Sequence, residues 1–330
     1  MPRVRRQVIS NCMYEVCFRA KESIPLVATE YMKLLIGSIL ARTQRDHKVV
    51  ICHDIWNGSH PHIILVTKDS QQLINFVSEV QKKLTDAIKR LLGVKKLNIW
   101  EGRANIARIY DIETAISRIG YVYANPAQDD LEENIEKFPG YSSYRDFINA
   151  ESKLSAKHEK LYPWIRLHSI PKLTNYSLTT SQDRKLVMRL KNKNRSQSHI
   201  LTREPNAWMK CFGVEFEEDI KDINDRIIKN LRIREKEALD IRAKEKKSVM
   251  GATALRTQPL MKPHTPKKNS IKINVLSSCN EIRKEAIKAF AQFCNECRRC
   301  YLAWKAGDFS VVWPPGAFKP PIPPLYNAIV

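Results

Sequence analysis

The sequence predicts an α+β fold, in which a βαββαβ unit is followed by a basic and mainly helical region. Two observations predict it: strand-like alternation and helical spacing follow one another over residues 1–124, and Lys and Arg gather in the second half. The chain has 330 residues, 43% hydrophobic and 28% charged, which are values near globular averages. At roughly 100–200 residues per domain, this length predicts two or three folded units.

The hydrophobic pattern defines the elements of the first unit. Asn57-Gly58 is a strong hairpin signal between two of its strands, and Gly93 ends a long amphipathic helix. Asn125-Pro126 is expected to end the last helix of the unit. The expected elements, in order, are a strand over 12–20, a helix over 27–42, strands over 49–56 and 62–67, a helix over 70–92, a strand over 97–109 and a helix over 111–124. This order is ferredoxin-like.

The rest of the chain divides by composition. A highly charged helix is expected over 215–248, because acidic residues open it and basic residues close it, and another helix is expected over 280–305. The predicted units are a compact domain over 1–150, a basic helical region over 151–250, a linker over 251–270, and a C-terminal helix with a proline-rich tail over 271–330.

The charge is unevenly distributed. Lys and Arg number 56 against 35 Asp and Glu, a net charge of +21. Residues 1–150 hold 21 basic and 17 acidic residues, whereas residues 151–330 hold 35 and 18. This asymmetry predicts an electrostatic grip on a polyanion by the second half, with a merely well-solvated helical surface as the alternative.

Membrane and secretory signals are weak in this sequence. The most apolar stretch, residues 25–40, is interrupted by Glu30, Lys33 and Ser38, so it falls short of the ~18 apolar residues of a membrane helix. The basic start is not followed by the apolar segment of a signal peptide. We therefore expect a cytoplasmic protein without a membrane partner, and eight reduced cysteines.

Two histidines stand two residues apart at the start of the third strand. Because successive side chains in a strand point to opposite faces, His60 and His62 share one face and have a spacing that can bind one metal ion. A satisfied surface pair is the alternative.

A second candidate pair lies on the last helix of the unit. Tyr121 and Asn125 are four residues apart and share a helix face, whereas Tyr123 points about 200° away from Tyr121. Together they supply a nucleophile and an oxygen ligand for the histidine pair. The alternative is a core tyrosine and a helix cap before Pro126.

These motifs occur in an order that resembles the REP-associated tyrosine transposases of the single-tyrosine HUH transposase superfamily. The resemblance covers about residues 1–146, and Pro61 departs from the bulky aliphatic residue usual between the histidines. The similar segments are Pro2-Arg3-Val4-Arg5-Arg6, Tyr14-Glu15-Val16, Ser59-His60-Pro61-His62, Trp100-Glu101-Gly102-Arg103, Tyr121-Val122-Tyr123-Ala124-Asn125-Pro126 and Pro139-Gly140-Tyr141-Ser142-Ser143-Tyr144.

The resemblance implies a DNA transposase that cleaves and rejoins single-stranded DNA bearing REP-like hairpins. Tyr121 would form a 5′-phosphotyrosine, with Mg or Mn bound by His60, His62 and Asn125. It also implies DNA contacts, which we assign to Arg103, Arg3, Arg5 and Arg6. A homodimer, in which the tyrosine of one subunit serves the histidines of the other, stays open. A nucleoid-associated cytoplasmic location follows from the substrate.

Three alternatives remain at this point. An inactive or domesticated transposase that only binds DNA has the same motifs. The βαββαβ order is also that of RNA-recognition domains, but those stack bases on strand aromatics, and residues 62–67 offer a histidine and aliphatics instead. Cys294, Cys297 and Cys300 are spaced like cluster ligands, although on a helix they are more typical of a stripe of thiols.

Overall fold

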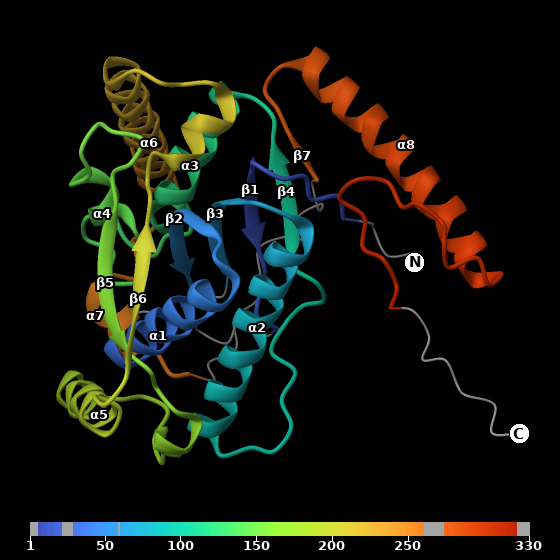
Figure 1. Ribbon diagram of the computed structural model, residues 1–330. Helices are drawn as coiled ribbons and strands as arrows, with labels where there is room; N and C mark the ends of the chain where they lie inside the picture. Colours follow the sequence, from blue (N-terminus) through green and yellow to red (C-terminus); the bar gives the residue numbers. More distant parts are fainter. Residues whose placement is uncertain (1–5, 22–28, 59, 261–273, 322–330) are drawn as a thin grey trace, which may run out of the picture.

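The computed structural model describes residues 6–21, 29–58, 60–260 and 274–321 (Figure 1). It has an α+β fold, which confirms the predicted class. A single mixed sheet contains seven strands among the described residues, in the order β5-β6-β2-β3-β1-β4-β7. No helix in these ranges is long and apolar enough to cross a membrane.

The first half of the chain contains the expected alternation of elements, with shifted boundaries. Its elements are β1 (Cys12–Cys17), α1 (Glu30–His47), β2 (Val50–Asn57), β3 (His60–Thr67), α2 (Ser70–Leu92), β4 (Asn105–Ile109) and α3 (Ile112–Gln128). Helix α1 begins later than predicted because Thr29 is its N-cap and accepts a hydrogen bond from the amide of Met32. The apolar stripe of α2 is buried along its length, and Gly93 in a left-handed conformation ends it.

The second half differs from the expected helical region, because it adds strands to the same sheet. Its elements are α4 (Tyr144–Ile148), β5 (His158–Pro163), η2 (Leu167–Ser169), α5 (Thr180–Lys193), β6 (Ser198–Arg203), η3 (Ala207–Phe212), α6 (Glu217–Glu245), α7 (Ala252–Thr257), β7 (Val275–Leu276) and α8 (Asn280–Lys305). Strand β6 runs parallel to β2, and β5 pairs with β6. The expected linker contains α7, whose Leu255 is buried in the core, while residues 261–270 lie outside the described residues.

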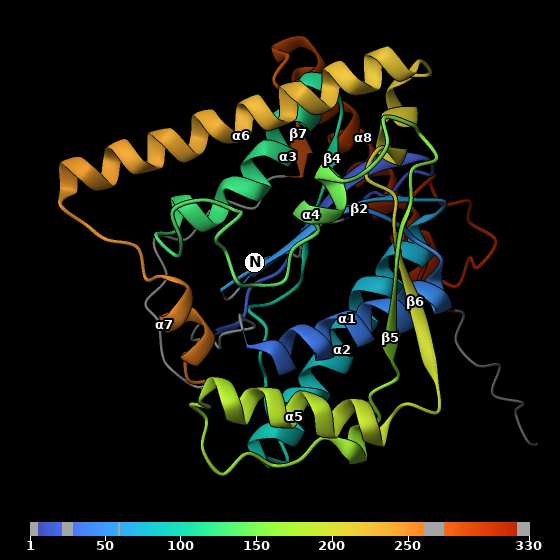
Figure 2. The ribbon, with the colours of Figure 1, turned by 90° about the vertical axis from the view of Figure 1, so that its left-hand side faces the viewer.

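Helices cover both faces of the sheet. Figures 1 and 2 show α1 and α2 on one face and α3 and α6 on the other. Each interface has its own hydrophobic core: Leu35, Phe76 and Ile63 belong to the first, and Ile64, Val122 and Ile227 to the second. With both faces covered in the described structure, the sheet offers no open platform for stacked bases, which disfavours the RNA-recognition alternative.

Helix α8 lies apart from these layers, beside β7 at the sheet edge (Figure 1). Cys297 and Cys300 on it are buried, and the Cys300 thiol donates to the carbonyl of Val312 at 3.3 Å. The described part of the proline-rich tail docks on the start of the chain, where Val8 N–H donates to the Gly316 carbonyl at 3.3 Å. Residues 322–330 of the tail lie outside the described residues.

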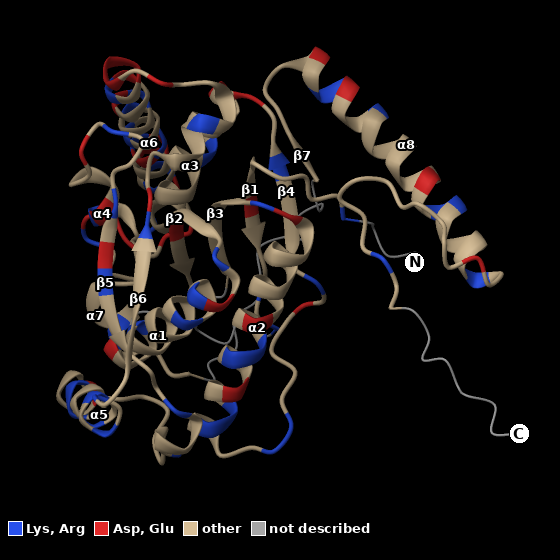
Figure 3. Cartoon of the chain, viewed as in Figure 1, with Lys and Arg blue, Asp and Glu red and all other residues tan. Residues whose placement is uncertain are grey.

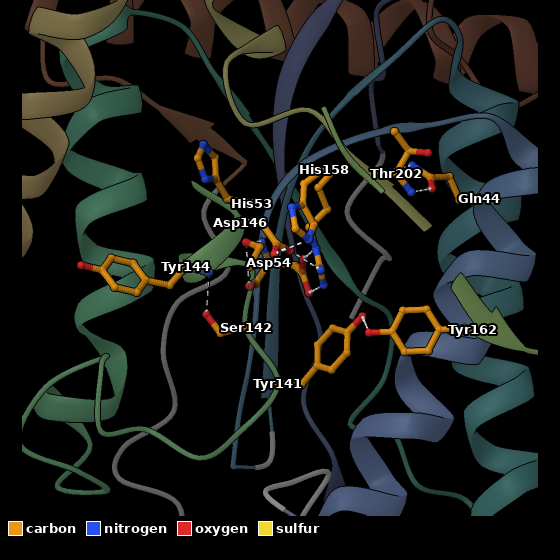
Figure 4. Close-up of polar contacts among 12 residues, drawn as sticks. Gln44, His53, Asp54, Tyr141, Ser142, Tyr144, Asp146, His158, Tyr162 and Thr202 are labelled. Atoms are coloured by element: carbon orange, nitrogen blue, oxygen red, sulfur yellow. Dashed lines mark hydrogen bonds and ion pairs between the residues drawn. The ribbon is translucent and has the colours of Figure 1, made fainter. Parts of the chain in front are cut away.

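A buried ion pair joins the two halves of the chain. Asp54 in β2 is fully buried, and its carboxylate accepts from Arg203 Nε in β6 at 2.7 Å. Arg203 also donates to Asp146 at 2.6 Å, and Asp146 is 2.9 Å from His158 in β5. Figure 4 shows His158, Asp146 and Asp54 converging at this point. Since a buried charge needs a partner, this cluster ties β5 and β6 to the first unit.

Replacing one partner of this pair should destabilise the protein strongly. Arg203→Met leaves the Asp54 carboxylate buried without its cation, so we expect a loss of about 3–5 kcal/mol in the free energy of unfolding, measured by urea denaturation. The double variant Asp54→Asn/Arg203→Met removes both charges and should lose less than the sum of the two single losses. Additive losses would show that the two side chains are not coupled.

Candidate active site around Tyr121

The two candidate histidines lie together at the start of β3. Their ring centroids are 5.2 Å apart, and His62 is buried. Pro61 lies in β3, next to the end of its pairing with β1. The last residue pair between these two strands is Cys17 and His62, so the missing N–H of Pro61 costs no hydrogen bond to β1. The proline therefore leaves both imidazoles on the α3 side of the sheet.

Glu15 in β1 sets the orientation of His62. Its carboxylate is 2.8 Å from His62 Nδ1, which leaves Nε2 buried and without a hydrogen-bond partner. Arg118 of α3 donates to the same carboxylate through Nε at 2.8 Å and Nη2 at 2.6 Å. Burial alone would raise the pKa of Glu15, but the hydrogen bonds and charges of His62 and Arg118 outweigh it and lower the pKa to about 2.

His60 is held as a neutral imidazole. Burial lowers its pKa to about 3, and the neighbouring His62 and Arg19 act in the same direction. Its Nε2 is 3.8 Å from a carboxylate oxygen of Asp129, which follows α3. His60 therefore presents a ring nitrogen with a lone pair at neutral pH, as a metal ligand requires.

Tyr121 lies against this cluster. Its ring centroid is 6.1 Å from that of His62, with the planes nearly perpendicular. The Arg118 guanidinium is 4.3 Å from the Tyr121 ring centroid, and that of Arg234 in α6 is 5.7 Å away. Burial raises the pKa of Tyr121, and Arg118 opposes that rise. The guanidinium groups of two arginines therefore lie beside the Tyr121 ring, and positive charge in this position would attract a phosphate group.

Tyr123 points to the opposite side of α3, as the helical phase predicts. It is fully buried, and its hydroxyl lies 2.8 Å from His53 Nδ1 and 2.9 Å from Ser143 Oγ. Its ring stacks on Phe147. Tyr123 is therefore part of the core, and of these two tyrosines it is Tyr121 that faces the histidines.

Asn125 has a structural role as well as a place on the Tyr121 side of the helix. The sequence suggested that Asn125-Pro126 ends the helix, but α3 continues to Gln128 with Pro126 inside it. Proline cannot donate to the carbonyl of Val122, and the Asn125 side-chain amide donates to it instead at 3.3 Å. This bond uses the amide nitrogen of Asn125 and not its amide oxygen.

Helix α6 holds α3 in place within one chain. Asn230 packs on Gly120, where an added Cβ would lie 2.5 Å from its Oδ1. Arg234 donates to Ser117 Oγ at 2.9 Å, and Arg242 donates to the Ala127 carbonyl near the end of α3. The tyrosine, the histidines and Glu15 thus form a single cluster without a second copy of the chain.

The structure describes two of the four arginines that were predicted to contact DNA, Arg6 and Arg103. Arg3 and Arg5 lie outside the described residues. Arg6 is half-buried and donates to the Ala104 carbonyl, and the nearby charge of Arg103 adds to burial in lowering the pKa of Arg6. In the sheet, Asn105 and His62 both pair with Cys17, so Arg103 and Arg6 lie at the same end of the sheet as the histidines.

Four contributors to the site were not assigned from the sequence: Glu15, Arg118, Arg19 and Arg234. Arg118 precedes Tyr121 by three residues on the same helix face, and Glu15 is a single carboxylate in an otherwise buried strand. Both patterns are signals that sequence reasoning can use. Arg234 has no local signal, because only the packing of α6 on α3 brings it there.

Other features are less suited to chemistry. A cavity of about 850 Å³ lies between α1, α2 and residues 164–170, on the face of the sheet opposite Tyr121. Figure 3 shows Lys and Arg positions spread over α2, α5 and α6, with Asp and Glu positions interspersed on α6. Within the described ranges, no three His, Cys, Asp or Glu side chains group as metal ligands, so a cation at His60 and His62 needs a different third ligand.

Neutralising Glu15 should weaken the site and the fold in a pH-dependent way. The pKa of folded Glu15, about 2, is below its ordinary value of 4.5, so its stabilisation is complete above about pH 4.5 and disappears as the pH falls through 2. Glu15→Gln should therefore lower the unfolding free energy by on the order of 3 kcal/mol near neutral pH. In urea denaturation curves, the gap to the wild type should close toward pH 2, and a gap that is constant with pH would contradict this assignment.

Comparison with known proteins finds a distant structural similarity. No family model and no curated protein matches the chain. A REP-associated tyrosine transposase, solved bound to a REP hairpin, matches with a TM-score of 0.39 and 19% sequence identity. The match covers 45% of this chain and 86% of that one.

Proposed function

We propose that the protein is a metal-dependent DNA strand transferase of the HUH transposase type, with Tyr121 as its nucleophile. The observation that carries the proposal is that the Tyr121 ring lies 6.1 Å from the ring of His62, with the guanidinium groups of Arg118 and Arg234 4.3 and 5.7 Å from it. In this proposal, β2, β3, β1 and β4 with α1 and α2 form a ferredoxin-like HUH domain.

The reaction would be a transfer of a phosphodiester to the tyrosine. The phenol oxygen of Tyr121 attacks the phosphorus, the bond to the 3′ oxygen breaks, and a 5′-phosphotyrosine and a free 3′-OH result. Attack by a DNA 3′-OH reverses the step, so no ATP is needed. Arg118 and Arg234 would stabilise the phenolate and bind the phosphate oxygens, and Glu15 would hold Arg118 in position.

A divalent cation, Mg or Mn, is part of the proposal. The residues suit such an ion, because His62 Nε2 is buried without a partner and Glu15 fixes the other ring nitrogen. His60 and the amide oxygen of Asn125 would be the further ligands. When bound, the ion would polarise the scissile phosphate.

The proposed substrate is single-stranded DNA with a hairpin, because a tyrosine at the surface of a helix needs an accessible backbone. Arg6 and Arg103 would contact it from the end of the sheet that carries the histidines, and Arg3 and Arg5 are proposed as further DNA contacts. The proposed reaction takes place in the cytoplasm, on the nucleoid. A homodimer is not required, because one chain brings its own tyrosine and histidines together.

A protein that binds DNA without cutting it is the second candidate. The observation that favours it is the lack of a third His, Cys, Asp or Glu ligand beside His60 and His62 among the described residues. The two functions share the arginines and differ in whether a covalent intermediate forms.

Tyr121→Phe should abolish the covalent adduct and leave DNA binding within about a few-fold, because only the nucleophilic oxygen is lost. The assay is denaturing electrophoresis after incubation with labelled single-stranded hairpin DNA and Mn or Mg. Tyr123→Phe is the matched control: it should keep the adduct, while losing about 1 kcal/mol or more of stability with its buried hydrogen bonds. An adduct that persists in Tyr121→Phe would refute the nucleophile assignment, and no adduct with the wild type would favour the DNA-binding candidate.

His60→Ala and His62→Ala should each weaken binding of Mn²⁺, measured by electron paramagnetic resonance of the free ion without DNA. Loss of one of three ligands should lower the affinity about tenfold or more, and the adduct should fall with it. His168→Ala removes an exposed histidine elsewhere and should change neither. Unchanged Mn²⁺ binding in the double variant His60→Ala/His62→Ala would contradict the metal assignment.

A further inference from the structure

A cavity of about 560 Å³ lies where the two halves of the chain meet. It is bounded by the start of α1, the loop before α4, strand β5 and helix α5. Tyr141 and Tyr162 line it, and their hydroxyls are 3.4 Å apart (Figure 4). Arg203, from the ion pair that joins the halves, also lines it. The cavity therefore exists only because β5 and β6 have joined the sheet of the first unit.

The acidic side chains that line this cavity are already engaged. Glu30 forms an ion pair with Lys33 at 2.5 Å, Glu136 pairs with Arg232, and Asp146 pairs with Arg203 and His158. Their negative charge is thus balanced by cations of the chain itself, and little of it remains to attract a further cation.

Four basic side chains of the lining have no such partner. They are exposed, and none of them forms an ion pair with a described residue. They are Arg145 of α4, Lys160 of β5, Lys191 of α5 and Arg256 of α7. Because folding brings these like charges from four elements to one cavity, they repel one another, and an anionic ligand would relieve that repulsion.

The cavity borders the β2–β3 hairpin, which carries the two histidines. Trp56 N–H in β2 donates to the Tyr141 carbonyl at 2.9 Å, and Trp56 pairs with Pro61, which stands between the two histidines. The cavity and the histidines therefore lie at the same end of the sheet. A single strand of DNA bound at Tyr121 could therefore extend past this hairpin and reach the four cations.

We propose that this cavity, which we call the cation groove, binds the phosphate backbone of single-stranded DNA next to the strand held at Tyr121. The choice of DNA rests on the proposed function, whereas the anionic polymer follows from the groove. Cations on several elements around an open hollow match a chain of phosphates better than one compact anion. Three of the four cations come from the second half, so the groove gives that half a specific role in DNA binding.

The test is the salt dependence of binding. Arg145, Lys160, Lys191 and Arg256 are replaced together by Gln, and affinity for a labelled single-stranded oligothymidylate is measured by fluorescence anisotropy over a range of salt, without metal. If each cation contacts one phosphate, the log–log slope should flatten by about 2 to 3, from ~0.7 per contact. Equal melting temperatures would show that the exposed substitutions leave the fold intact.

The matched control replaces four exposed lysines elsewhere, Lys221, Lys229, Lys284 and Lys288, by Gln. The control loses the same charge and should keep most of the slope. Equal slopes in the two variants would overturn the groove as a specific site, and so would no change in either. An equal loss of slope with duplex DNA would overturn the preference for a single strand.

This measurement is independent of cleavage. If the wild type forms no covalent adduct but the groove variant alone loses slope, the groove stands and the proposed strand transfer fails. If the adduct forms and the groove variant binds like the control, the proposed strand transfer stands and the groove proposal fails.

Discussion

The candidate site depends on one buried carboxylate. Glu15 lies inside the sheet with 4% exposure, and a charge in such a place has to be neutralised and hydrogen-bonded. His62 of β3 and Arg118 of α3 supply these hydrogen bonds to the Glu15 carboxylate, and Arg118 also supplies a positive charge. In doing so, Glu15 fixes which nitrogen of His62 is free and holds the Arg118 guanidinium over Tyr121. The packing of β1, β3 and α3 is thus linked directly to the chemistry that we propose for the site.

The second half of the chain supports this arrangement from two sides. Asp54 and Arg203 join β2 to β6, so the sheet spans the boundary that composition predicts near residue 150. Helix α6 lies along α3 and brings Arg234 to Tyr121, while Asn230 fills the space above Gly120. The same joint creates the cation groove.

Local pattern was sufficient for some features and not for others. The order of elements in the first half, the common face of His60 and His62, and the opposite directions of Tyr121 and Tyr123 follow from periods of two and 3.6 residues. The strands β5 and β6 were not predicted because their pairing depends on contacts between segments that are distant in the sequence. One of these contacts is made by the buried Arg203, which the sequence shows only as another basic residue in a basic region. Asn125-Pro126 looked like a helix end because the capping of Val122 by the Asn125 side chain is invisible to a propensity argument.

The central claim is that the Tyr121 phenol oxygen becomes bonded to DNA. Its most direct test is mass spectrometry of the protein after reaction with single-stranded hairpin DNA, nuclease trimming and digestion with trypsin. The tryptic peptide 119–137 contains both Tyr121 and Tyr123, so fragmentation within it can assign the attachment to one of them. The account predicts a nucleotide linked through phosphate to Tyr121. A nucleotide on Tyr123, or on a residue outside this peptide, would contradict it.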